Sequence, residues 1–213
     1  MPVSPTDANA PPSVKPQRLS KGDQRKVDIL RAAMIIFARD GFAGSSLANV
    51  AKVAGLSTVG LLHHFPNKLA LLQAVLAQRD AYIAEKLQQV QQAPSLAGFV
   101  AFLQLVLQFS AEDPAVSQAL IIINTESLSV THPAHQWFTE RFGIVHQHLQ
   151  AHLQLLIDSG EIRSDVDPKQ LSLEIAAMMD GLQIQWLRSP GQVQIESVFG
   201  KFLARLAADL ARR

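Results

Sequence analysis

The chain contains 213 residues, 48% of them hydrophobic, and carries a formal net charge of +1. This length and composition are typical of a globular protein with a substantial core in one or two domains. The sequence has no cysteine, which excludes disulfides and thiolate metal sites. It also has no apolar run near the ~18 residues of a membrane span, so we expect a cytoplasmic protein without a membrane partner.

The first segment, residues 1–20, differs in composition from the rest of the chain. It holds five prolines in its first sixteen residues, and it lacks the apolar core of a signal peptide. Such a segment cannot build a core, so we expect a disordered N-terminal arm.

The next segment has the pattern of two short helices joined by a tight turn, preceded by a longer helix over about residues 22–40. Gly55 ends the first short helix because glycine adopts positive φ at no steric cost. Ser57 caps the second, and Pro66 stops it because proline disfavours helix at the residue before it. The second helix, Thr58 to His64, is marginal alone. It is typical of a recognition helix held in the DNA major groove by a scaffold.

Charge is unevenly distributed along the chain. Residues 1–92 have a balance of +5, whereas residues 93–213 have a balance of −4. A basic face supplies the salt-dependent part of DNA affinity. Simple solvation of a small domain explains the same charges equally well.

These motifs resemble the N-terminal domain of the TetR family of transcriptional regulators over roughly residues 21–87. The matching segments are KVDILRAAMIIFARDGF, the turn before Ser57, and LLHHFPNK followed by LALLQAVL. The family usually has a tyrosine that contacts phosphate where this chain has Leu62. The resemblance implies an all-α fold of about nine helices, with a three-helix helix-turn-helix DNA-binding domain over residues 21–67. A larger helical domain for effector binding and dimerisation then spans residues 68–213.

The resemblance also implies which residues face the DNA. Thr58 and Val59 would lie nearest to base edges, and Lys68 would contact phosphate. Capping of the helix end is the alternative role for the two histidines of this set. The predicted DNA-binding residues are Ser45, Ser46, Thr58, Val59, Gly60, His63, His64 and Lys68.

The rest of the chain reads as helices with almost no strand-like alternation. A long fourth helix begins after Asn67 and bridges to the second domain, and the longest clear loop is Asp158 to Asp167. Prolines near the first turns delimit further helices. These are expected near residues 95–110, 114–129, 134–158, 168–187 and 192–211.

The last two predicted helices carry apolar residues on two faces, with Leu187 and Leu203 on the outer one. A helix that is apolar on two sides needs two packing partners. We therefore predict a homodimer through these helices, which the resemblance also implies. Coverage of both faces within one chain is the alternative.

Histidines and large apolar residues mark the second domain. His148 and His152, with His146 nearby, have a spacing that would allow a metal site, but we predict neither metal nor cofactor because no HExxH pattern is present. We also predict no enzymatic activity, since the P-loop, GxGxxG and GxSxG motifs are absent. Residues from four helices are predicted to line an apolar pocket, with ordinary core packing as the alternative: Phe102, Asn124, Trp137, Phe142 and Met178.

The sequence therefore predicts a ligand-responsive transcriptional repressor that a small apolar or aromatic effector releases from double-stranded operator DNA. The mechanism implied by the resemblance is a change in the separation of two recognition helices, which the effector shifts by binding one arrangement better. The alternative is a DNA-binding architectural or interaction protein with no small-molecule ligand.

Overall fold

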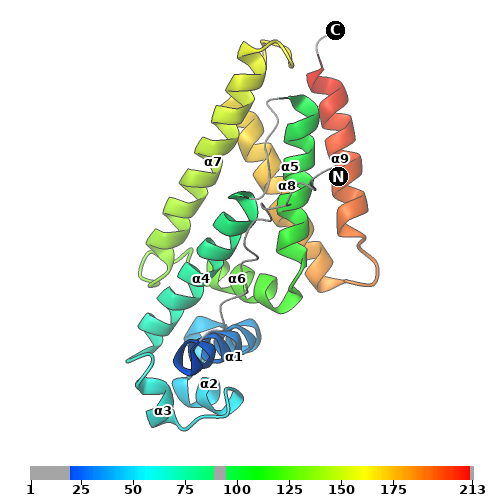
Figure 1. Ribbon diagram of the computed structural model, residues 1–213. Helices are drawn as coiled ribbons and strands as arrows, with labels where there is room; N and C mark the ends of the chain where they lie inside the picture. Colours follow the sequence, from blue (N-terminus) through cyan, green and yellow to red (C-terminus); the bar gives the residue numbers. More distant parts are fainter. Residues whose placement is uncertain (1–19, 89–94, 212–213) are drawn as a thin grey trace, which may run out of the picture.

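The computed structural model describes residues 20–88 and 95–211, so the predicted arm lies outside the described residues except for Ser20. The described ranges are all-α, as predicted, with nine helices and no strand. The helices, shown in Figure 1, are α1 (Lys21–Gly44), α2 (Leu47–Val53), α3 (Thr58–Leu62), α4 (Lys68–Gln88), α5 (Leu96–Ala111), α6 (Pro114–Glu126), α7 (His135–Asp158), α8 (Pro168–Arg188) and α9 (Ile195–Leu210).

Local side chain–backbone hydrogen bonds explain where most helices begin. Ser57 Oγ accepts from the backbone N–H of Gly60 at 3.0 Å and so caps α3. Asp113 and Asp167 cap α6 and α8, each of which has a proline in its first turn. Gly55, at φ 67°, forms the turn between α2 and α3. The sequence predicted these starts and this turn.

The buried side chains form two separate clusters. The N-terminal core joins α1 to α4 with two residues of α6, Ala119 and Ile123, and with Ala134 and Phe138 at the start of α7. The C-terminal core joins α5, the second half of α7, α8 and α9. In Figure 1, α6 and the lower end of α7 lie beside the helices that carry the recognition segment. The N-terminal core therefore takes residues from both halves of the sequence.

No single described helix is long and apolar enough to cross a membrane. Only α5 and α6 together have the required length and composition, and they meet at a bend of 94°.

Candidate DNA-binding interface

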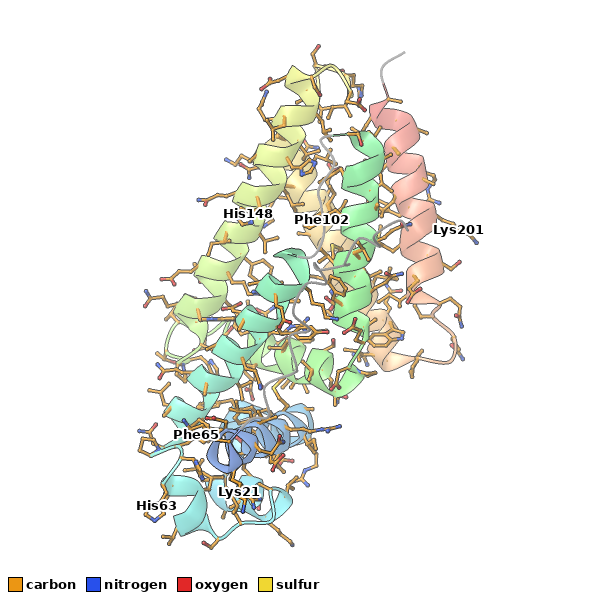
Figure 2. All side chains as sticks on the ribbon, viewed as in Figure 1. Lys21, His63, Phe65, Phe102, His148 and Lys201 are labelled. Carbon is orange, nitrogen blue, oxygen red and sulfur yellow. The ribbon has the colours of Figure 1, made fainter. Side chains whose placement is uncertain are left out.

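The recognition segment α3 presents a short surface that is exposed on one side and anchored in the core on the other. Leu61 is fully buried in the N-terminal core and anchors the helix, while Thr58 and His63 are exposed. Val59 is 66% exposed, a large value for a valine. Figure 2 shows His63 at the outer edge of the molecule and Phe65 directed inward. The exposed residues of α3 thus form an outward-facing surface on a buried anchor.

Two adjacent serines have different roles at the start of α2. Ser46 is exposed, and its Oγ accepts from the backbone N–H of Asn49 at 3.2 Å. Ser45 is buried, and its hydroxyl donates to the backbone carbonyl of Phe42 at 2.7 Å. The structure therefore turns the Ser45 side chain toward the end of α1, away from the surface that was predicted to face DNA.

Lys68 is engaged at the end of α1. Its ammonium donates to the carbonyl oxygens of Phe42 at 2.7 Å, Ser45 at 2.9 Å and Ala43 at 3.4 Å. It also lies 4.4 Å from the centroid of the Phe42 ring. An ammonium has three donors, and carbonyls at a helix C-terminus lack intrahelical partners. Lys68 therefore ties the start of α4 to the end of α1, which is a different role from the predicted phosphate contact.

The other predicted DNA-binding residues lie on or beside the exposed surface of α3. Gly60 and His64 are half-buried beside the exposed Thr58, Val59 and His63. Lys52, exposed in the last turn of α2, was not predicted. Lys52 is a cation next to the recognition helix. Its position in the sequence, shortly before that helix, could have indicated a DNA contact. The individual contacts remain predictions.

The end of α1 is also held by the second half of the chain, at a site that sequence reasoning missed. We call it the α1–α6 junction: Gly41, Phe42, Glu126 and His132. The backbone N–H of Phe42 donates to Glu126 Oε2 at 2.7 Å. Gly41 has φ 70°, and a Cβ atom there would overlap with Glu126 Oε1. Glycine is needed at this position for its conformation and for the approach of the carboxylate.

His132 completes the junction from the loop before α7. Its ring packs edge-on against the Phe42 ring, with centroids 5.2 Å apart. Its Nδ1 accepts from the backbone N–H of Ala134 at 3.1 Å, and its Nε2 lies 3.9 Å from Glu126 Oε2. Burial lowers the pKa of His132, which Glu126 partly offsets. The neutral form of His132 therefore suits this geometry.

The structure does not gather the five predicted ligand residues around one cavity. Trp137 and Phe142 pack against the N-terminal core, and Phe102 and Met178 against the C-terminal core. Asn124 is half-buried on α6. Two surface hollows of about 310 and 460 Å³ lie between α5 and α9 and between α7 and α8, and neither is lined by these residues. The predicted pocket thus remains a prediction.

Some polar atoms in the interior have no hydrogen-bond partner. Arg79 Nε on α4 and His146 Nδ1 on α7 are both buried without a hydrogen-bond partner. Burial lowers the pKa of Arg79, with a further contribution from Arg141. Among the described residues, no group of three or more His, Cys, Asp or Glu side chains is arranged to hold a metal.

The outer face of the last two helices differs in part from the prediction. Leu203 is fully buried, because the core stripe of α9 runs through Ile195, Phe199 and Leu203. The prediction that Leu203 faces outward is wrong. Leu187 is half-buried. Other large apolar side chains lie exposed on α8 and α9: Leu173 at 52%, Ile184 at 44% and Val198 at 43%.

Comparisons with known proteins cover both halves of the chain. Residues 29–75 match the family model "Bacterial regulatory proteins, tetR family". Residues 97–208, more than half of the chain, match the model "BetI-type transcriptional repressor, C-terminal". The solved structure of a TetR transcriptional regulator from Chloroflexus aurantiacus has a TM-score of 0.76 at 21% identity, covering 90% of this chain and 98% of that one.

Curated relatives include the HTH-type transcriptional regulator RutR of Escherichia coli, 36% identical over 95 residues. That match covers 44% of this chain and 45% of RutR, so it spans less than half the length of either protein. The nucleoid occlusion factor SlmA of Vibrio campbellii is 21% identical over 202 residues, which cover 90% of this chain and 98% of SlmA.

Proposed function

The chain belongs to the TetR family of DNA-binding transcriptional regulators, and we propose that it is a repressor released from operator DNA by a small apolar or aromatic effector. The observation that carries this proposal is the α1–α6 junction. It links the helices that hold the recognition segment to a helix of the second half. A change in α6 would therefore move the end of α1 and, through Lys68, the start of α4.

The effector would act by favouring one of two arrangements of the recognition helices. An effector that binds better to the arrangement unable to hold DNA lowers DNA affinity, and DNA weakens effector binding by the same factor. Glu126 supports such coupling because a hydrogen bond to a carboxylate is strong and directional. A shift of α6 by about an ångström would break this bond.

In this proposal the effector contacts Phe102, Asn124, Trp137, Phe142 and Met178, which would have to come together around it because this structure does not gather them at one cavity. These residues come from α5, α6, α7 and α8 and offer mostly apolar surface. Nearby helices carry the buried Arg79 Nε and His146 Nδ1 without partners. A buried polar atom without a partner is costly, so a polar group on the effector that reached either atom would gain affinity.

The functional unit in this proposal is a homodimer through α8 and α9. Leu173, Ile184 and Val198 would be covered by a second copy, which packs as a four-helix bundle. Two recognition helices then read the two halves of a palindromic operator.

The experiment has two steps. Double-stranded fragments are first selected from a random DNA pool with the purified chain and sequenced. Apolar and aromatic compounds are then screened for thermal stabilisation and for release of the selected DNA. A compound at a hundred times its Kd should stabilise the protein by about 2.7 kcal/mol, which raises Tm by roughly 5–10 °C. Stabilisation without DNA release would contradict a repressor controlled by that compound.

A second function stays open because the match to SlmA spans nearly its full length. The chain would then be a DNA-binding architectural or interaction protein with no small-molecule ligand. In that case DNA selection succeeds and no compound gives concentration-dependent stabilisation.

A further inference from the structure

The recognition helix has an unusual chemistry for reading DNA. Residues 57–62, Ser-Thr-Val-Gly-Leu-Leu, include no Arg, Lys, Asn, Gln, Asp or Glu. Those are the side chains that form the strongest base-specific hydrogen bonds in the major groove, often two at a time. The Oγ of Ser57 is already occupied as the cap of α3. Among residues 57–62, the exposed Thr58 hydroxyl is the side-chain group left to hydrogen-bond a base edge, and it discriminates weakly because a hydroxyl can either donate or accept.

Besides the exposed Thr58, the surface of α3 presents two apolar side chains. Val59 is 66% exposed and Leu62 is 38% exposed, and a spacing of three places them on the same side of the helix. Val59 lies in the first turn, the part of a recognition helix that contacts base edges, whereas Leu62 lies a turn further along. The anchor Leu61 points into the core, so α3 cannot rotate to hide Val59 without exposing Leu61.

We propose that Val59 reads the 5-methyl group of thymine, so that the operator has a T·A pair beneath the first turn of α3. This inference rests on the proposed binding of operator DNA. The thymine methyl is the apolar group that a base pair presents in the major groove. Packing Val59 on it removes apolar surface from water. Packing Val59 on a G·C edge would bury polar atoms without partners.

The test uses the fragments selected with the purified chain. Each thymine of one half-site is replaced in turn by deoxyuridine, which removes the methyl and leaves every Watson–Crick hydrogen bond in place. Binding is measured at fixed salt, because affinity depends strongly on salt concentration. We expect affinity to fall about 3- to 10-fold at one or two positions, as loss of a buried methyl implies.

Two variants assign the effect to a residue. The Val59→Ala variant should bind fragments with thymine or deoxyuridine at the sensitive position with equal affinity, because the methyl group has lost its apolar partner. Leu62→Ala is the matched control, and its thymine preference should be unchanged. Both side chains are partly or largely exposed, so both variants should fold, which far-UV circular dichroism checks.

Three results would overturn the inference. The first is equal affinity for thymine and deoxyuridine at every position of the selected fragments. The second is a thymine preference that Val59→Ala retains, because another group then reads the methyl. The third is a selection that yields no common sequence, which leaves no base pair to read. An operator that is selected but not released by any effector contradicts the repressor proposal and leaves the reading by Val59 intact.

Discussion

The two cores are held together in different ways. In the N-terminal core, polar side chains bridge elements far apart in sequence, with Lys68 on the carbonyls of α1 and Glu126 on the N–H of Phe42. The C-terminal core packs mainly through apolar side chains, and an ion pair between Arg163 and Asp209 lies at its surface. Directional bonds fix one geometry, whereas apolar packing tolerates rearrangement. The difference suits a DNA-binding unit of fixed geometry attached to a second half that can rearrange, as the proposed function requires.

The largest expected effect separates the inside of the C-terminal core from its outer face. Leu203→Glu places a charge among apolar side chains, so we expect a loss of more than about 4 kcal/mol and failure to fold. Ile184→Glu should fold normally but give monomers with weak operator binding, because its charge would meet its own copy across the two-fold axis. Thermal unfolding and light scattering measure both. A dimeric Ile184→Glu at the same concentration would place the interface elsewhere.

A pair of glycines tests the polar bridge in the N-terminal core. Gly41 and Gly55 have φ of 70° and 67°, and only Gly41 has a neighbouring group within 4 Å of an added Cβ. Gly55→Ala should cost about 1–2 kcal/mol through the backbone alone. Gly41→Ala should cost about 1.5–3 kcal/mol more, because the methyl displaces the Glu126 carboxylate. Urea unfolding measures both, and equal losses would show that Glu126 moves aside freely.

Lys68 and Lys52 distinguish a structural cation from a DNA-binding one. Lys68→Met keeps the apolar stem but loses the bonds to three carbonyls, so it should cost about 1.5–3 kcal/mol of stability. The DNA affinity of Lys68→Met should depend on salt concentration as steeply as that of the wild type. Lys52→Met should change stability by less than about 0.5 kcal/mol and flatten the salt slope by about one. If Lys68→Met instead flattened the salt slope and left the stability unchanged, Lys68 would be the residue that contacts phosphate.

The smallest effect is a pH dependence at the α1–α6 junction. The unfolded chain protonates His132 near the ordinary pKa of 6.5, while the folded protein binds this proton only at lower pH. The contribution of His132 is therefore complete above pH 6.5, and stability falls as the pH decreases below it.

His132→Asn removes this titration and keeps an acceptor for the Ala134 N–H. Between pH 7.5 and 5.5, the wild type should lose more of its free energy of unfolding than the variant, because only the wild type takes up the His132 proton on unfolding. Urea unfolding at both pH values measures the difference. A parallel decline in the two proteins would mean that His132 titrates alike in the folded and unfolded states.

Local chemistry made much of the fold predictable from the sequence. The cap Ser57 and the turn at Gly55 act within three or four residues, so their effect can be read directly from the chain. The same holds for the exposure of Thr58 and Val59, because an amphipathic helix two turns long has one buried face.

Long-range contacts could not be predicted in this way. Glu126 and Phe42 are 84 residues apart, and no sequence pattern marks a carboxylate that will cap a distant backbone N–H. The phosphate contact of Lys68 stays a prediction, but its bonds to the carbonyls at the end of α1 could not be predicted, because residues 42–45 lie more than twenty positions away in the sequence. Leu203 was assigned to the wrong face because α9 is apolar on two sides, and periodicity alone cannot say which side is inside.

The composition of the N-terminal core has a consequence for synthesis of the protein. When α1 to α4 of a nascent chain have just emerged from the ribosome, the four later residues that complete the core have not. These are Ala119, Ile123, Ala134 and Phe138. At about 5–20 residues per second, the missing segment takes several more seconds to emerge. During that interval the part of the α1 surface that packs against α6 is uncovered, and the N–H of Phe42 lacks the Glu126 carboxylate. The recognition helix is thus translated early but reaches its final support only after the start of α7 has been made.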